Sequence, residues 1–324
     1  MPDKPSYEVP LPRQPKPGEF DFDLDRTLRS IVALQAVIPE DAFTASILGT
    51  ERAGSGVVIG DSGLVLTIGY LVTEAESIWL TGADGRVTPG HVLAYDQETG
   101  FGLVQALGRL DLPALELGRS GQGRIGEPVV VAGGGRRQSV SAEIIGKEEF
   151  AGYWEYLLEE AIFTAPAHPY WGGTGLIGRD GKLLGIGSLH LRQVVEGGPP
   201  RDINMVVPID LLPPILDDLL TYGRVNKPAR PWLGVYTVES GGKVVVADVA
   251  ESGPAASAGM QQGDVIASVR DGSVEGLSDL YRKVWASGPA GTEIPLEVVR
   301  DGRAVWLRVK SADRSAYLKR PKLQ

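Results

Sequence analysis

The chain has 324 residues, among them 43 glycines and 23 prolines, and it contains no cysteine. This length suits about two domains. The lack of cysteine excludes disulfides, a thiolate nucleophile and clusters or zinc sites ligated by cysteine. A formal net charge of −9 argues against nucleic acid as a partner. We predict no cofactor.

The first residues differ in composition from the rest of the chain. Residues 1–24 are proline-rich and polar, and we expect a disordered arm. They hold no apolar stretch of the kind that a secretory signal needs. We therefore expect a cytoplasmic protein if the chain is complete, and a periplasmic one if a signal peptide has been removed. No run of about 18 apolar residues predicts a membrane span.

Residues 25–223 are predicted to form one domain rich in β-strands. Short apolar runs between glycine turns indicate strands at 56–59, 64–67, 77–80, 101–106, 129–132, 162–165, 183–188 and 203–208. Many short strands at this spacing favour a closed barrel or a sandwich. Helical patterns occur at 153–160 and at 209–220, and Gly223 ends the second one.

A basic linker bounded by prolines, residues 224–230, precedes a second domain at 231–312. Strands are predicted there at 235–238, 244–249, 265–269, 293–300 and 304–310, with one helix at 277–286. This pattern is typical of a small α+β domain. Residues 313–324 are a basic tail, which we interpret as a solvated chain end.

The most specific motif lies in the second domain. Residues 252–266 read SGPAASAGMQQGDVI, in which a proline at a helix start precedes small residues, a glycine stop and a Gly-Asp turn. This run resembles PDZ domains of the type associated with bacterial proteases. Upstream, PWLGV at 231–235 resembles their carboxylate-binding loop. The resemblance implies that backbone N–H groups capture a chain terminus while the next strand edge accepts a peptide.

The second wall of such a groove would be the helix at 277–286. Leu280 and Val284 lie one turn apart on it, opposite Leu233 and Val235. The alternative is that all four are simply core residues. The complete predicted peptide-binding set is Trp232, Leu233, Gly234, Val235, Leu280 and Val284.

The first domain resembles the trypsin-like domain of the HtrA (Deg) serine proteases. The match begins with AGSGVVI at 53–59 and LVLT at 64–67, and it extends to VPI at 207–209. With the PDZ motif, the resemblance covers about residues 25–312. It implies a mainly β fold, with a trypsin-like double β-barrel followed by a PDZ domain. It also suggests a homo-oligomer, often a trimer.

Acyl transfer in this family needs a hydroxyl nucleophile, an imidazole base and a carboxylate that orients the base. At the matching positions this chain has Tyr70 for the histidine, Gly100 for the aspartate and Gly172 for the serine. Tyr170 replaces a glycine whose N–H helps to bind the oxyanion. We therefore predict that the usual triad is lost.

Two further motif matches are not interpreted as functional sites, and the first is predicted to be a hairpin turn. The tetrapeptide GDSG at 60–63 resembles the surroundings of a nucleophilic serine, but it joins two predicted strands. The run GQGRIG at 121–126 matches a dinucleotide-binding pattern, but a strand follows it where a helix should begin.

The chain has three histidines, and none has a metal-like spacing, so we predict no metal site. His168 lies four residues before Gly172 and offers an alternative dyad with Thr174. Carboxylates at 148, 149, 155, 159 and 160 are interpreted as a solvated helix face. The aromatic residues Tyr153, Trp154, Tyr156, Tyr170 and Trp171 are expected to fill the vacated cleft; the alternative is that they line a pocket for a peptide or ligand.

Together these features predict a non-catalytic, HtrA-like pseudoprotease. It would bind peptides or protein C-termini through the PDZ domain and act as an adaptor, a holdase or a regulator in protein quality control. Two alternatives stay open. One is a divergent hydrolase that uses His168 with Thr174, and the other is a regulatory subunit of an active HtrA relative.

Overall fold

The computed structural model describes residues 7–194 and 197–319. Residues 1–6 of the predicted arm and 320–324 of the predicted basic tail lie outside the described residues. The chain divides into two compact units. The first contains the residues up to 148 together with 160–225, and the second contains 149–159 and 226–319.

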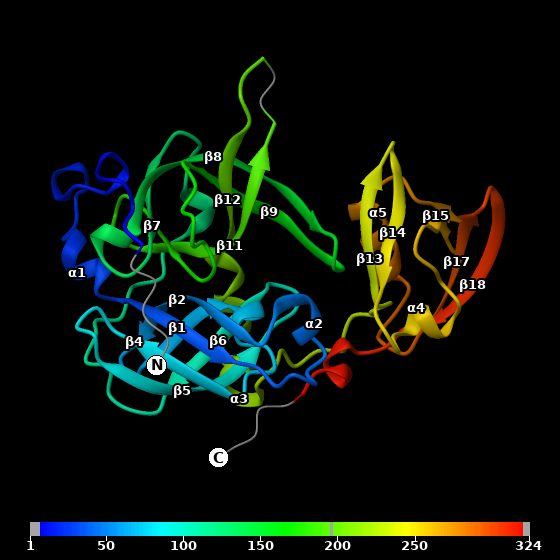
Figure 1. Ribbon diagram of the computed structural model, residues 1–324, viewed down its shortest axis with the longest axis horizontal. Helices are drawn as coiled ribbons and strands as arrows, with labels where there is room; N and C mark the ends of the chain where they lie inside the picture. The colour runs from blue at the N-terminus through cyan, green and yellow to red at the C-terminus, as the bar shows by residue number, and fades with distance from the viewer. Residues whose placement is uncertain (1–6, 195–196, 320–324) are drawn as a thin grey trace. The chain divides into compact units, whose positions relative to one another are not determined.

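The first unit is built around two closed β-barrels (Figure 1). The strands of the first barrel are β1 (Ile31–Val37), β2 (Glu51–Gly60), β3 (Leu64–Ile68), β4 (Ser77–Thr81), β5 (Val87–Tyr95) and β6 (Phe101–Ala106). Their order around the barrel is β1-β2-β3-β6-β5-β4. Closure leaves no free sheet edge.

The strands of the second barrel are β7 (Pro128–Ala132), β8 (Ser139–Gly152), β9 (Tyr156–Ala165), β10 (Gly175–Ile177), β11 (Leu183–Gln193) and β12 (Arg201–Pro208). They close in the order β10-β11-β12-β9-β8-β7. The predicted double barrel is therefore confirmed. Strands β1, β5, β8 and β10 were not predicted from the sequence.

Short helices connect and flank these barrels. The α-helices are α1 (Leu24–Leu28), α2 (Ala45–Leu48) and α3 (Pro213–Tyr222). The 3₁₀ turns are η1 (Leu11–Arg13), η2 (Pro17–Glu19), η3 (Gly69–Leu71), η4 (Ser120–Gln122), η5 (Arg136–Gln138) and η6 (Ile209–Leu211). Gly223 ends α3 in the left-handed conformation, as expected for a glycine just after a helix.

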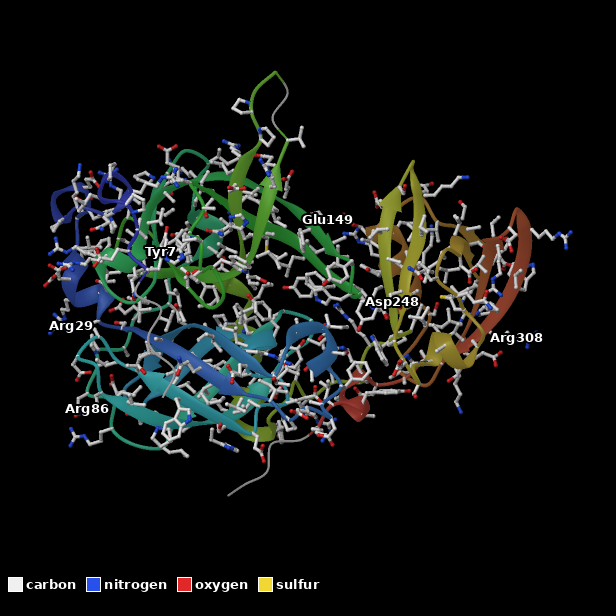
Figure 2. The ribbon with its side chains drawn as sticks, in the orientation of Figure 1. Tyr7, Arg29, Arg86, Glu149, Asp248 and Arg308 are labelled. Carbon is white, nitrogen blue, oxygen red and sulfur yellow. The ribbon has the colours of Figure 1, made fainter. Side chains whose placement is uncertain are left out.

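The described part of the N-terminal arm differs from the expectation of disorder. Val9 is 2% exposed and donates its N–H to the carbonyl of Arg137 at 2.7 Å. Phe20 and Leu24 are also buried, and the ring of Tyr7, labelled in Figure 2, packs edge-on against that of Tyr170. Composition alone misses this because a few apolar residues among the prolines are enough to dock the segment.

The helical pattern predicted at 153–160 is wrong. Strand β8 ends just before this segment, which consists of a turn at residues 153–155 and the first residues of β9. The ring of Trp154 stacks on that of Tyr156 at 5.4 Å between centroids. A short apolar and aromatic run does not by itself distinguish a helix from a strand, and tertiary packing decided it here.

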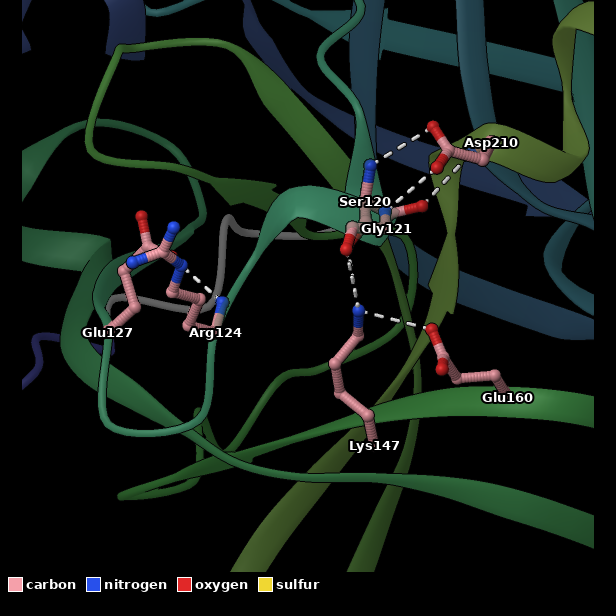
Figure 3. A network of polar contacts seen from close by, with 7 residues as sticks. All are labelled: Ser120, Gly121, Arg124, Glu127, Lys147, Glu160 and Asp210. Carbon is pink, nitrogen blue, oxygen red and sulfur yellow. Dashed lines mark hydrogen bonds and ion pairs between the residues drawn. The ribbon is translucent and has the colours of Figure 1, made fainter.

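The turn predicted at 60–63 and the strand expected after 121–126 are both present. The segment at 60–63 is the turn between β2 and β3 and is closed by a hydrogen bond from the N–H of Gly63 to the carbonyl of Gly60. In the loop at 120–126, the N–H groups of Ser120 and Gly121 donate to the carboxylate of Asp210 at 3.0 and 2.8 Å (Figure 3). These amides hold an internal carboxylate, and strand β7 follows.

The second unit contains a six-stranded sheet in the order β13-β14-β15-β17-β18, with β16 paired to β15. Its strands are β13 (Val235–Ser240), β14 (Lys243–Val249), β15 (Val265–Val269), β16 (Gly272–Ser273), β17 (Glu293–Arg300) and β18 (Arg303–Lys310). Its helical elements are α4 (Pro254–Ser257), α5 (Leu277–Ala286) and η7 (Arg314–Tyr317). Helix α5 has the predicted bounds. Asp264, next to β15, accepts two hydrogen bonds from Arg300, each 2.7 Å long.

The two barrels approach each other closely at one glycine. Gly173 has φ 76°, and a Cβ there would lie 1.9 Å from the carbonyl oxygen of Ser55 on β2. The neighbouring Gly172 accepts a 2.8 Å hydrogen bond from the N–H of Ser55. Only glycine has both the conformation and the size for this position.

We expect Gly173→Ala to lower the free energy of unfolding by about 3 kcal/mol or more, through strain and steric overlap. Gly49→Ala is the matched control, because Gly49 has a similar φ of 77° but a Cβ there would meet nothing within 4 Å. The control should lose only the strain of its backbone conformation, with φ 77° and ψ 172°, which is about 1–3 kcal/mol. Urea unfolding of both variants tests this, and equal losses would contradict the steric argument.

Candidate functional site

The structure brings together the three positions that match a catalytic triad. A Cβ on Gly172 would lie 2.8 Å from the hydroxyl oxygen of Tyr70. Gly69, adjacent to Tyr70, donates its N–H to the carbonyl of Gly100 at 2.7 Å. The segments that carry Tyr70, Gly100 and Gly172 therefore converge in the first unit, and the side chains available there decide its chemistry.

Tyr70 has the properties of a structural hydrogen-bond donor. Its hydroxyl donates to the carbonyl of Ser188 on β11 at 2.8 Å. Burial raises the pKa of Tyr70 well above its ordinary value, and a hydrogen bond with the Trp171 side chain opposes that rise without cancelling it. A phenol held protonated in this way cannot accept a proton from a nucleophile near neutral pH.

His168 uses both ring nitrogens in contacts with the backbone. The N–H of Tyr170 donates to its Nδ1 at 3.0 Å, so we assign the proton to Nε2, which lies 2.8 Å from the carbonyl of Gln138. Burial lowers the pKa of His168 and keeps the ring neutral. The N–H of Tyr170, expected at an oxyanion-binding position, thus donates to the chain's own imidazole.

The alternative dyad of His168 with Thr174 has no support in this geometry. The Thr174 hydroxyl is buried and donates to the carbonyl of Trp171 at 2.8 Å. Because the two ring nitrogens of His168 contact Tyr170 and Gln138, neither activates this hydroxyl.

Gly100 differs from an orienting aspartate in its backbone as well as in its side chain. It has φ 82°, in the left-handed region that favours glycine. An aspartate there would be strained in the present backbone conformation. Gly100 therefore has no side chain that could orient a base, and its backbone conformation disfavours one.

The aromatic residues expected to fill the cleft separate into two groups. Trp171 packs against His190 with 5.2 Å between ring centroids, and Tyr170 packs against Tyr7. Tyr153, Trp154 and Tyr156 belong to the second unit, so the expectation is wrong for these three. Their proximity to the cleft in sequence misled the prediction, because a long hairpin carries them into a different unit.

The predicted carboxylate-binding loop is formed in the second unit. Gly234 has φ 78°, and this conformation points the N–H groups of Leu233, Gly234 and Val235 at one acceptor. Such a concave set of amides is a binding site for an anion. Leu233 and Val235 also share a buried apolar cluster with Leu280 and Val284 of α5, so all four are core residues, as the alternative interpretation expected.

Trp232 lies beside this loop and does not direct its N–H to the same acceptor. Its N–H and carbonyl both pair with Ala312, each at 3.0 Å. Its ring packs edge-on against Tyr317. Trp232, which was predicted to bind peptide, therefore has a structural role next to the loop.

The anion in the loop is the side chain of Glu155, from the turn between β8 and β9. Its carboxylate accepts hydrogen bonds from the N–H groups of Leu233 at 3.0 Å, Gly234 at 2.7 Å and Val235 at 3.1 Å. Glu155 is 6% exposed, which corrects its interpretation as part of a solvated helix face. Burial raises its pKa to about 7, while the three N–H groups and the charge of Arg314 act to lower it.

Sequence reasoning missed Glu155 because a glutamate among other glutamates carries no sign of burial. Of the carboxylates grouped with it, Glu148 and Glu149 are exposed, and Glu160 pairs with Lys147 at 3.1 Å. The aromatic residues on both sides of Glu155 were the available signal, since a charge flanked by Trp154 and Tyr156 is more easily shielded from water.

The described residues contain neither a metal cluster nor a membrane-spanning helix. Within residues 7–194 and 197–319, no group of three or more acidic or histidine side chains is arranged to hold a metal ion. In the same part of the chain, no helix has the length and apolar character needed to cross a bilayer.

Comparison with known families agrees with both units. Residues 54–186 match the trypsin-like peptidase domain, and residues 231–310 match the PDZ domain. A probable periplasmic serine endoprotease, DegP-like, from Pseudomonas fulva is 29% identical over 273 residues, which are 80% of this chain and 55% of that protein. One of the same description from Chlamydia muridarum is 27% identical over 272 residues, covering 79% and 53%. The chain spans about half the length of these relatives.

Solved structures show the same fold. An HtrA-type protease, AlgW with tripeptide, matches with a TM-score of 0.53 and 23% identity over 92% of this chain and 97% of that one. A serine endoprotease from Yersinia pestis matches with a TM-score of 0.52 and 22% identity, covering 89% and 95%. At this level of identity the likeness concerns the fold.

The raised pKa of Glu155 predicts a pH-dependent stability. An unfolded glutamate has a pKa of about 4.3, so between that value and about 7 the folded state binds more protons and loses stability as the pH rises. Relative to Glu155→Gln, the wild type should lose up to about 3 kcal/mol between pH 4.5 and 7.5 in urea unfolding. The exposed Glu148→Gln control should follow the wild type, and parallel curves for all three proteins would contradict the buried titration.

Proposed function

The chain belongs to the HtrA family, and on that premise we propose that it is a pseudoprotease, which binds extended peptides or protein C-termini through its PDZ domain without cleaving them. It would act as an adaptor, a holdase or a regulator. The relatives named above are serine endoproteases, and this chain differs from the residues that such chemistry needs at the positions that align with a catalytic triad.

The observation that carries the proposal is the hydrogen bonding in the cleft. The Tyr70 hydroxyl donates to Ser188, and the N–H of Tyr170 donates to His168. Catalysis of acyl transfer requires a base beside the nucleophile and free donors where the oxyanion forms. In this chain the corresponding groups contact other parts of the protein, which favours loss of hydrolysis over a substituted mechanism.

The PDZ fold supports peptide binding as the retained activity. A set of converging amides next to an edge strand is the arrangement with which such domains hold a terminal carboxylate and pair with a peptide backbone. Oligomerisation, including a trimer, stays a prediction. The idea that this chain regulates an active relative by mixed assembly also stays open to test by co-purification.

We further propose the periplasm as the compartment, because the relatives are named as periplasmic proteins. The cytoplasmic alternative has no support from these relatives.

We expect the wild type to cleave unfolded casein at less than about 10⁻⁴ of the rate of an active HtrA protease. Gly172→Ser should stay equally inactive, since the new hydroxyl would face the protonated Tyr70 and no base. Labelled casein and gel electrophoresis measure this. Time-dependent cleavage by the wild type that is lost on Tyr70→Phe would overturn the proposal.

A further inference from the structure

We propose that the hairpin tip, residues 149–159, is an internal ligand that occupies the peptide-binding groove of the PDZ domain and is displaced when a chain terminus binds. This inference rests on the proposed peptide-binding function of the same groove. Three sets of contacts, all within the second unit, carry it.

In the first set of contacts, a side chain of the hairpin tip takes the place of a peptide's terminal carboxylate. The Glu155 carboxylate uses the N–H groups of Leu233, Gly234 and Val235. A free C-terminus carries the same group, with the same charge and the same two oxygens. Because the three donors are already directed at one buried acceptor, an incoming carboxylate can bind only where Glu155 leaves.

In the second set of contacts, the backbone of the hairpin tip takes the place of the peptide backbone. Strand β13 lies at the edge of its sheet, and the N–H of Thr237 on it donates to the carbonyl of Tyr153 at 2.9 Å. From α5, the Tyr281 hydroxyl donates to the carbonyl of Gly152 at 2.7 Å and lies 3.2 Å from the backbone nitrogen of Glu155. The tip is thus held by the edge strand and by the helix, as an added peptide would be.

In the third set of contacts, Leu157 takes the place of an apolar side chain of the peptide. Leu157 is 7% exposed and belongs to the same buried cluster as Leu233, Val235, Leu280 and Val284. An apolar side chain and a carboxylate together are what the last residue of an aliphatic C-terminus provides. The hairpin tip therefore supplies both of the groups that a peptide with an aliphatic C-terminal residue would supply.

The hairpin tip is held tightly enough to compete but in a form that can be displaced. Around it, Arg282 pairs with Glu149 and Glu159, and all three side chains are well exposed, so these ion pairs add little. Burial opposes the charged form of Glu155, which weakens the hold of its three hydrogen bonds. A tethered ligand acts at a high effective concentration, so even modest contacts reduce the affinity for a free peptide.

The test measures how tightly a short fluorescein-labelled peptide with a free C-terminal leucine binds the full chain, by fluorescence anisotropy. We expect Glu155→Ala to bind the peptide at least about tenfold more tightly than the wild type. In this variant no carboxylate of the chain occupies the three amides, so a larger fraction of the molecules can bind peptide. Glu155→Gln should fall between them, since the amide oxygen still accepts hydrogen bonds. The exposed Glu148→Gln is the matched control and should equal the wild type, and the C-terminal amide of the same peptide should bind weakly to every variant.

Equal affinities for the wild type and Glu155→Ala would overturn the internal ligand and leave the peptide site in place. Absence of binding by every variant would overturn the peptide-binding function and the inference with it. Amide hydrogen exchange without peptide gives a second measurement. It does not use the alanine variant, so it stays informative if that variant fails to fold. In Glu155→Gln the amides of Leu233, Gly234 and Val235 should exchange faster than in Glu148→Gln, and unchanged protection would overturn the inference.

Discussion

The buried carboxylate of Glu155 and the three N–H groups around it organise the second unit. The hydrogen bond to Leu233 joins residues 78 positions apart in sequence and holds the tip of the β8–β9 hairpin within the PDZ unit. A buried carboxylate is tolerated only when its oxygens have strong donors, and a concave loop of amides favours an anion as its acceptor. Each therefore meets the requirement of the other.

The same principle recurs in the first unit. In the loop at 120–126, two amides are satisfied by Asp210, and in the cleft the N–H of Tyr170 is satisfied by His168. Buried donors need acceptors, and the chain supplies them here from its own side chains. In the cleft the acceptor comes from a residue two positions away along the chain. In the PDZ unit it comes from a hairpin tip, so occupancy there is reversible in principle.

Local patterns predicted the elements that depend on local chemistry. The motif at 252–266, the bounds of α5 and most strands of both barrels follow from glycine, proline and apolar spacing. The helical interpretation of 153–160 failed because a short apolar run suits a helix or a strand, and tertiary packing decided it: Leu157 of β9 joins the PDZ core. The N-terminal arm was misjudged because Val9 has its partner, Arg137, more than a hundred residues away along the chain.

The sequence by itself indicated the family, the two kinds of domain and the residues that align with a catalytic triad, because these are carried by side-chain type and by spacing along the chain. Only the tertiary structure decided what surrounds Tyr70, His168 and Glu155. Hydrogen bonds over long sequence separations and burial set the chemistry of these three groups, and neither is encoded in any short segment. Glu155, which the sequence suggested was solvated, is thereby buried and accepts hydrogen bonds from the amides at 233–235.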